Sequence, residues 1–269
     1  MSAARLDTKY VVKPWGRPDI GSFSNPEGER IGEIWFDGPT GRHPPLLVKY
    51  IFTSEKLSIQ VHPDDQQGQA AGLAGGKSEC WYVLAAEPGA RLGIGTTVPL
   101  DGAQLRAAAL DGTLEELMDW KPVQPGSFYY IPAGTVHAIG AGVTLVEVQQ
   151  NNDVTYRLFD YGRPRELHLE DGVAVSQAGP YALPERIVPM GCDIALVDGA
   201  SAPFRLDMLY WEVGSRTLTA QLDLGWFIPL SGAGTINGQP WEAGQCWLVE
   251  GQADIEVARQ GSILWANLP

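Results

Sequence analysis

The chain has 269 residues, 44% of them hydrophobic, and a formal net charge of −13 at pH 7. A chain of this length and composition can bury a core as one large domain or two small ones, which argues against fibrous and disordered classes. The negative charge argues against nucleic-acid binding, whereas an anionic small molecule fits wherever basic residues converge. Cys80, Cys192 and Cys246 are isolated and lack C-x-x-C spacing, which argues against a disulfide framework or a thiolate zinc cluster.

No segment predicts export or membrane insertion. The first residues, MSAARLDTKYVVKPW, lack the apolar run of a signal peptide, and no stretch of about 18 uncharged apolar residues occurs. We therefore expect a cytoplasmic protein with no membrane partner. No motif encodes the oligomeric state.

Short apolar segments separated by glycine and proline turns dominate the chain. Such a pattern indicates an all-β sandwich or barrel. The clearest expected strands are residues 46–52, 56–62, 79–85, 126–132, 143–149, 218–224, 245–251 and 253–259.

Segment 98–120 departs from this pattern because alanine and leucine recur in it at helical spacing. We expect a short helical insertion there, with Asp111 and Thr113 as N-caps. A second helix signal lies within residues 64–75, after a Pro-Asp-Asp start.

The expected domain organisation has a catalytic β-domain over residues 1–166, a proline-punctuated connector over 167–203 and a smaller β-unit over 204–269. The histidines, His43, His62, His137 and His168, all precede the midpoint of the connector. The last unit therefore has no imidazole for a metal, and it is expected to be either a structural repeat without a site or an unrelated β-extension.

Ser58, Gln60 and His62 lie two residues apart in the segment SIQVHPDD. Alternate residues of a strand share a face, so these side chains would project together. With Glu79 and His137 they supply two imidazoles and a carboxylate, a set that holds a divalent metal and leaves a position open. Each of these residues alone is more often an ordinary core or surface residue.

The spacing around His137 is more specific. Residues Gly126 to His137 read G-x5-P-x-G-x2-H, which resembles the second metal motif of the cupin superfamily. The first cupin motif, usually H-x-H with a downstream Glu, is here Q-x-H with a longer gap before Glu79. The resemblance implies a mainly β cupin fold, the double-stranded β-helix or jelly roll.

Further motifs narrow the resemblance. The stretches QVHPDD, KSECWY, PAGTVHAI and VEVQQNNDVTYRLFDYGR, with VKPWG and IGEIW upstream, are similar to the type I mannose-6-phosphate isomerases, particularly the short bacterial form. This resemblance covers roughly residues 9–170. It implies a metal-dependent aldose-ketose isomerase that interconverts mannose 6-phosphate and fructose 6-phosphate through a cis-enediolate.

The resemblance also implies the site residues. One Zn²⁺ per chain would be held by His62, Glu79 and His137, with Gln60 as an additional ligand, and the catalytic arginine would be Arg157. Gln60 could instead bind substrate or a water at the metal. A metal with an open position can organise the sugar oxygens, and a guanidinium stabilises developing negative charge.

Three nearby residues have open roles. Lys77 precedes Glu79 by two residues and is either catalytic, contacting the sugar phosphate or an oxyanion, or a solvated turn lysine. Ser58 could donate a hydrogen bond to substrate. Asp153 could orient Arg157 or transfer a proton, and the proton-transfer base does not follow from sequence. Phosphate contacts could come from Arg163 or Arg165.

Three other functions are compared with sugar-phosphate isomerisation. Nucleotide hydrolysis would need a phosphate loop, which the segment GLAGGKS, residues 72–78, resembles only superficially, because a strand signal follows it where a helix would be required. A cupin oxygenase or another iron enzyme would use the same ligand types. A non-catalytic sugar-binding or structural cupin is separated from an isomerase by Arg157→Ala, which should abolish sugar-phosphate turnover of an isomerase while metal binding survives.

Overall fold

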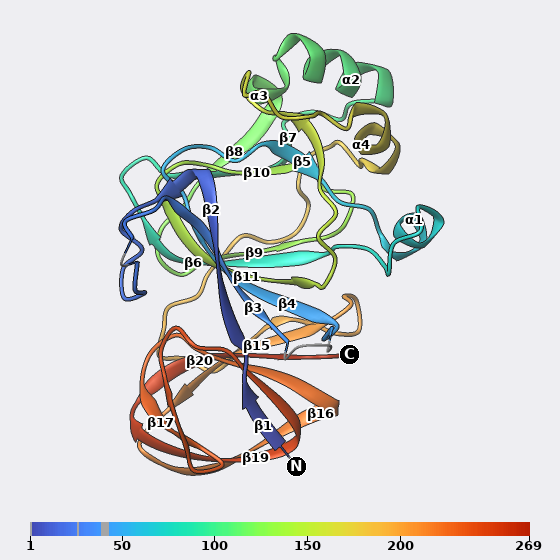
Figure 1. Ribbon diagram of the computed structural model, residues 1–269. Helices are drawn as coiled ribbons and strands as arrows, with labels where there is room; N and C mark the ends of the chain where they lie inside the picture. The colour runs from blue at the N-terminus through green and yellow to red at the C-terminus, as the bar shows by residue number, and fades with distance from the viewer. Residues whose placement is uncertain (1, 26, 39–42) are drawn as a thin grey trace.

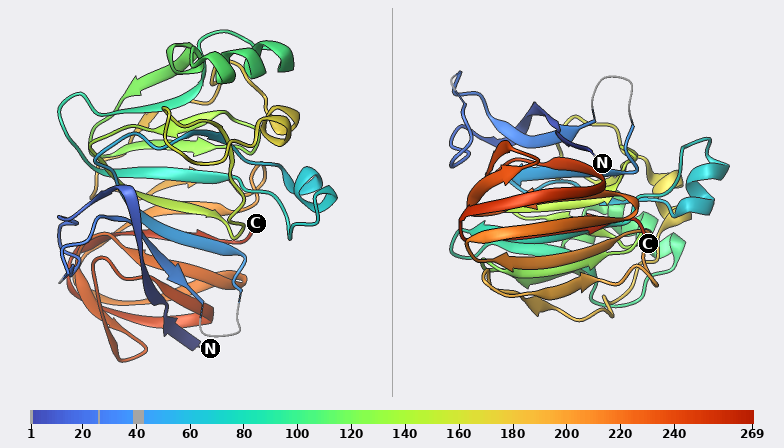
Figure 2. Two further views of the ribbon diagram at one scale, coloured as in Figure 1. Left: turned by 45° about the horizontal axis from the view of Figure 1, so that its top comes forward. Right: turned by 90° about the horizontal axis from the view of Figure 1, so that it is seen from below.

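The computed structural model describes residues 2–25, 27–38 and 43–269. Three antiparallel sheets are stacked, with a helical cap at one end and the eight-stranded sheet of the C-terminal unit at the other (Figure 1). Figure 2 shows these layers from two further sides. The mainly β architecture with short helices agrees with the predicted fold class.

The seven-stranded sheet lies in the middle of the stack. Its spatial order is β13-β9-β6-β11-β4-β3-β2. These strands are β2 (Asp7–Arg17), β3 (Ile31–Asp37), β4 (Leu46–Phe52), β6 (Glu79–Ala86), β9 (Ser127–Ile131), β11 (Val143–Gln150) and β13 (Arg186–Ile187).

The five-stranded sheet faces it, in the order β12-β5-β10-β7-β8. Its strands are β5 (Ile59–Val61), β7 (Arg91–Thr96), β8 (Met118–Pro122), β10 (His137–Ile139) and β12 (Tyr156–Phe159). The helices α2 (Gly102–Asp111), α3 (Leu114–Leu117) and α4 (Leu169–Val175) lie at the far end of the stack, and α1 (Asp65–Ala70) projects from one side (Figure 1).

The eight-stranded sheet forms the C-terminal unit, in the order β14-β15-β20-β16-β19-β17-β18 with β1 paired to β19. Its strands are β1 (Ser2–Arg5), β14 (Ile194–Val197), β15 (Arg205–Trp211), β16 (Gly214–Pro229), β17 (Ala233–Ile236), β18 (Gln239–Glu242), β19 (Trp247–Arg259) and β20 (Gly261–Asn267). The first strand of the chain therefore lies in this sheet, although the sequence analysis groups it with residues 1–166. The boundaries at 166 and 203 stay predictions.

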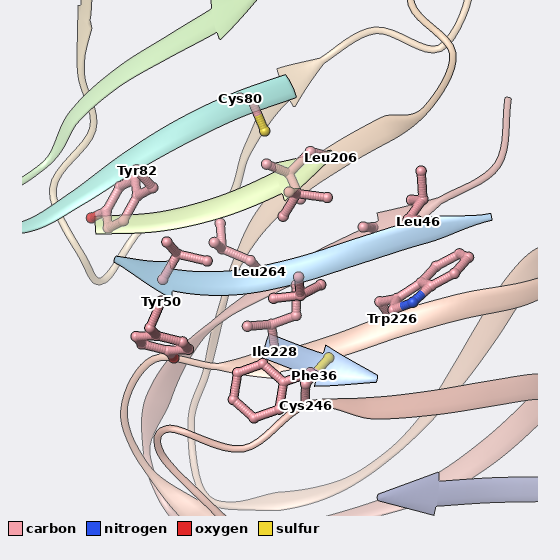
Figure 3. Close-up of a cluster of buried hydrophobic side chains, with 14 of the residues drawn as sticks. Phe36, Leu46, Tyr50, Cys80, Tyr82, Leu206, Trp226, Ile228, Cys246 and Leu264 are labelled. Atoms are coloured by element: carbon pink, nitrogen blue, oxygen red, sulfur yellow. The ribbon is translucent and has the colours of Figure 1, made fainter. Parts of the chain in front are cut away.

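Alternation in the seven-stranded sheet separates an apolar face from a polar one. Val48 and Tyr50 of β4 belong to the apolar cluster packed against the eight-stranded sheet, whereas Lys49 between them faces the opposite way, into a cavity. Figure 3 shows side chains from both sheets interdigitating in this cluster, among them Phe36, Cys80, Trp226 and Leu264. Burial of this apolar surface joins the two units.

The five-stranded sheet buries its outer face under the helices. Ile59, Val61, Ala138 and Leu158 form one cluster with Leu105 and other residues of the helical cap. Because alternate strand residues point to opposite faces, the residues between them point toward the seven-stranded sheet.

Helices α2 and α3 form the predicted helical insertion, but they begin and end at other residues than the sequence predicts. Asp101, not Asp111, is the N-cap of α2, since its carboxylate accepts from the backbone N–H of Gln104 in a capping box. Asp111 ends α2, and Thr113 is the N-cap of α3 without a side-chain hydrogen bond. Residues 118–120 are in β8 instead of a helix.

Two further differences concern glycine. Helix α4 lies inside the predicted connector, and a Cβ on its Gly172 would come within 2.7 Å of Leu158, so glycine allows close packing on β12. The predicted strands 245–251 and 253–259 are parts of one strand, β19, which runs through Gly251 without interruption.

The helix signal within 64–75 is confirmed by α1, which Asp64 caps.

No helix in the described part of the chain is long and apolar enough to span a membrane.

Candidate metal centre and active site

One row of paired residues crosses the five-stranded sheet at the candidate site. Arg157 of β12 pairs with Gln60 of β5, and Gln60 pairs with His137 of β10. Directly opposed residues in antiparallel strands project from the same face. The three side chains therefore point together toward the seven-stranded sheet.

His62 and Glu79 complete the group at this point. His62 follows β5 and Glu79 opens β6, so the two sheets contribute from opposite sides. Glu79 Oε2 lies 3.5 Å from His62 Nε2, and Glu79 Oε1 lies 3.5 Å from His137 Nε2. The ligand atoms of these three buried residues all lie within 4.8 Å of one another.

The protonation of the two imidazoles suits a metal. Burial lowers the pKa of His137 to about 4, and burial together with Lys77 holds the pKa of His62 well below its ordinary value. His137 Nδ1 lies 2.8 Å from the carbonyl oxygen of Thr135, which can only accept, so Nε2 keeps its lone pair. Both rings are thus neutral, as ligation requires.

The surroundings of the Glu79 carboxylate test independently whether these three residues fit a divalent metal ion. Its side chain is 1% exposed, and neither carboxylate oxygen accepts a well-formed hydrogen bond from the described residues. Buried carboxylates are ordinarily paired or bound to a metal. Among the described residues Oε1 has no donor and Oε2 has only the Lys77 ammonium at 3.1 Å, so a carboxylate between two neutral imidazoles fits a divalent cation.

Lys77 is buried beside this group and is not a solvated turn residue. Its Nζ lies 3.0 Å from His62 Nε2 and 3.1 Å from Glu79 Oε2. The ammonium is thus the cation nearest the three candidate ligands in the described part of the chain.

Gln60 and Ser58 continue the row predicted from the sequence. Ser58 Oγ donates to Gln60 Oε1 at 3.1 Å, and Gln60 Nε2 lies 3.3 Å from His137 Nε2. Rotation of the amide by 180° would turn its oxygen toward His137 and its nitrogen toward Ser58, which can also accept. Both roles expected for Gln60 thus remain compatible with its position.

Arg157 is held by His168, a residue to which the sequence analysis gives no role. The Arg157 backbone N–H donates to the imidazole Nδ1 of His168 at 3.3 Å, and the backbone N–H of His168 donates to the backbone carbonyl of Arg157 at 2.8 Å. The Arg157 guanidinium donates to the carbonyl of Glu166 at 3.2 Å. None of these hydrogen bonds involves Asp153, which is exposed, so the structure does not support Asp153 as the group that orients Arg157.

The two other candidate arginines share one buried carboxylate. Arg163 Nη2 donates to Asp160 Oδ1 at 2.7 Å, and Arg165 Nε donates to Asp160 Oδ2 at 2.6 Å. Only Arg165 of the two lines the cavity beside the metal group.

A buried charged row in the seven-stranded sheet is not predicted from the sequence. Lys49 pairs with Glu147 across the strands, and Glu147 pairs with Trp81. Lys49 Nζ lies 3.4 Å from Glu147 Oε1, and Trp81 Nε1 donates to Glu147 Oε2 at 2.9 Å. Lys49 also lies over the ring of Trp35, 4.7 Å from its centroid.

Neighbouring charges keep Lys49 an ammonium. Burial alone would lower the pKa of Lys49, but the carboxylates of Glu147 and Glu33 raise it. Burial and the proximity of Glu79 raise the pKa of Glu147. Burial opposes ionisation of Glu33, but Lys49 and Lys13 outweigh it and lower its pKa.

We predict that Glu147→Ala destabilises the protein by about 3 kcal/mol, because removing one partner of a buried pair leaves the other charge uncompensated. Lys49 and Glu147 side chains are each only 5% exposed. The double replacement Lys49→Met/Glu147→Leu should cost less than Glu147→Ala alone. Urea unfolding of the metal-free proteins measures both.

The matched control is the surface pair Arg106–Glu170, whose side chains are 47% and 77% exposed. Glu170→Ala should change the unfolding free energy by less than about 0.5 kcal/mol. A Glu147→Ala protein as stable as the wild type would show that Lys49 is not held by this pair.

A cavity of about 390 Å³ lies between the two sheets beside the metal group. Ser58, Gln60 and Lys77 line it, as do Lys49 and Glu147 of the charged row. Five cationic side chains outnumber three carboxylates in its wall: Lys13, Lys49, Lys77, Arg157 and Arg165 against Glu33, Glu147 and Asp153. In a chain of net charge −13, this local excess favours an anionic ligand.

The chain is similar to curated mannose-6-phosphate isomerases. It is 35% identical over 185 residues to mannose-6-phosphate isomerase of Streptococcus mutans, which covers 66% of this chain and 57% of that protein. It is 36% identical over 173 residues to mannose-6-phosphate isomerase ManA of Bacillus subtilis, covering 60% and 54%. The chain thus spans little more than half the length of these relatives. No protein-family model matches it.

Solved structures agree on the fold. A mannose 6-phosphate isomerase from Bacillus subtilis superimposes over 100% of both chains with a TM-score of 0.79 at 24% identity. A mutant phosphomannose isomerase from Salmonella typhimurium superimposes over 100% of both chains with a TM-score of 0.75 at 14% identity. The resemblance predicted from the motifs is confirmed by the sequence relatives, and the fold by these structures.

Proposed function

We propose that this protein is a metal-dependent aldose-ketose isomerase that interconverts mannose 6-phosphate and fructose 6-phosphate. The observation that carries the proposal is the buried group of His62, Glu79 and His137 beside a cavity rich in cations, whose wall includes Lys77 in contact with His62 and Glu79. The metal group suits chemistry at the sugar carbonyl, and the cations suit its phosphate. The similarity to mannose-6-phosphate isomerases supports this substrate.

The proposed cofactor is one Zn²⁺ per chain, held by His62, Glu79 and His137 with Gln60 as an additional ligand. Two imidazoles and a carboxylate are a common catalytic zinc set that leaves a position open. When bound, the ion supplies Lewis-acid polarisation of the sugar oxygens. Metal analysis of the purified protein distinguishes zinc from iron or manganese, which the same ligand types accept.

Arg157 and Lys77 carry the proposed catalytic roles. The reaction moves a proton between C1 and C2 and develops negative charge on the two adjacent oxygens of a cis-enediolate. The Arg157 guanidinium lines the cavity and stays charged at any physiological pH, so it can stabilise that charge without exchanging its own proton. Its hydrogen bonds to Glu166 and His168 fix its position beforehand.

Substrate binding is assigned to Ser58, Lys77 and Asp153, which all line the cavity. Lys77 is buried among the candidate ligands, whereas Asp153 stands exposed in the cavity wall. A group that moves a proton at a bound carbon must lie within hydrogen-bond reach of it. The buried position favours Lys77 over Asp153 for proton transfer.

We predict that Lys77→Ala lowers the rate of solvent deuterium exchange at C2 of the sugar by at least about 100-fold, the usual size of a lost acid-base catalyst. Asp153→Asn should lower the exchange rate by less than about ten-fold, because the electrostatic interactions of an exposed carboxylate are weak. Proton NMR of the substrate in D₂O follows the exchange directly. Unaltered exchange in both variants would remove both residues as candidates.

The proposed substrate is tested by comparing mannose 6-phosphate with mannose. If the cationic side chains of the cavity bind the phosphate, the kcat/KM for mannose should be at least about 1000-fold lower than that for mannose 6-phosphate. Mannose lacks the charge-assisted hydrogen bonds to the phosphate, which together contribute several kcal/mol. Equal rates for both sugars would contradict a sugar phosphate as the substrate.

A further inference from the structure

Gln149 lies beside Glu79 in the seven-stranded sheet, yet neither the sequence motifs nor the proposed mechanism uses it. Gln149 of β11 pairs directly with Glu79 of β6. Opposed residues in antiparallel strands project from the same face, with their Cβ atoms about 5 Å apart. The Gln149 side chain is therefore on the metal side of the sheet, and the residue is 0% exposed.

The orientation of the Gln149 amide is fixed by its nitrogen. Nε2 donates to the carbonyl oxygen of Gln150 at 2.9 Å and to that of Asn152 at 3.0 Å. A carbonyl oxygen can only accept, so a rotated amide would lose both hydrogen bonds. The amide oxygen must therefore point away from these two carbonyls.

That oxygen has no partner among the described residues. Gln149 Oε1 is buried and accepts no hydrogen bond, and of the two carboxylate oxygens of the adjacent Glu79 only Oε2 lies near a cation, Lys77. Buried acceptors without a donor are rare in native proteins, and several together indicate a missing ligand. Lys77 is not the missing donor, because its ammonium is engaged with His62 and Glu79.

We propose that Gln149 is a positioning residue of the metal centre, and that its amide oxygen accepts a hydrogen bond from an O–H group held there, a water molecule or a sugar hydroxyl. The inference rests on the metal centre proposed above. A neutral amide oxygen orients such a group without adding negative charge next to Glu79. A residue of this kind supports the metal indirectly, and its loss typically lowers metal affinity about 10- to 100-fold.

The test uses Gln149→Met, which keeps the length of the side chain and removes both its oxygen and the two N–H donors to Gln150 and Asn152. Zn²⁺ affinity is measured by competition with a chelator, and melting temperatures are recorded with and without Zn²⁺. We expect the affinity to fall about 10- to 100-fold, so that Zn²⁺ raises the melting temperature less than in the wild type. These readouts do not depend on turnover.

One further variant separates a metal-centre role from a structural one. Gln245→Met is the control, because Gln245 is a half-buried amide of the C-terminal unit that accepts from Trp247 Nε1 at 3.0 Å. Its Zn²⁺ affinity should stay within about three-fold of the wild type, since an independent site leaves the metal unaffected.

The inference is overturned if Gln149→Met keeps wild-type Zn²⁺ affinity and lowers the melting temperature equally with and without metal. The oxygen would then hold only a structural water. A wild-type protein that binds Zn²⁺ but does not isomerise the sugar phosphate would contradict the proposed function and leave this inference standing.

Discussion

Glu79→Ala is expected to lower kcat/KM for mannose 6-phosphate by at least about 1000-fold, the size of the Lewis-acid stabilisation that a bound metal provides. The carboxylate is the one anionic member of the candidate ligand group and bridges the Nε2 atoms of His62 and His137 at 3.5 Å each. Without it, two neutral imidazoles would hold the metal weakly. Activity is measured beside metal content.

The control for Glu79→Ala is Glu170→Ala, which removes an exposed carboxylate on α4. That variant should keep wild-type activity and metal content. A Glu79→Ala protein that retains both its metal and more than about a tenth of the activity would contradict the assignment of Glu79 as a ligand.

Arg157→Ala is expected to lower kcat by about 100- to 1000-fold while metal content stays that of the wild type, because removing one donor that stabilises a developing oxyanion typically costs this much. The guanidinium lies in the same sheet row as Gln60 and His137 but is no ligand. Arg157→Lys should recover only part of the rate, since an ammonium lacks the planar set of donors.

Arg106→Ala provides the matched comparison for Arg157→Ala. Arg106 lies on α2 and pairs only with the exposed Glu170, so turnover should be unchanged. Unimpaired turnover in Arg157→Ala would contradict a catalytic role for Arg157, and loss of metal together with turnover would point to a structural role for Arg157.

Local patterns in the sequence predict much of the candidate site. A period of two residues places Ser58, Gln60 and His62 on one face, and the structure has Ser58 and Gln60 in the cavity wall with His62 beside them. The fixed turn spacing before His137 likewise marks this residue as a candidate ligand, and His137 opens β10 beside the other candidate ligands. Both signals are local, because strand alternation and turn geometry depend only on neighbouring residues.

Pairings between distant strands could not be predicted in the same way. Lys49 stands within an apolar strand and Glu147 within another, and only the register of β4 against β11 brings them together. Gln149 is adjacent to Glu79 for the same reason. His168 begins a seven-residue helix that contains a glycine, a poor helix former, so the sequence predicts a connector there.

The most direct test of the proposed function is a coupled assay for fructose 6-phosphate formed from mannose 6-phosphate, before chelation, after chelation and after Zn²⁺ is restored. We predict turnover in the metal-replete protein, its loss on chelation and its recovery with Zn²⁺, because His62, Glu79 and His137 form the candidate metal group. Absence of turnover in metal-replete protein, or turnover that survives complete removal of the metal, would contradict it.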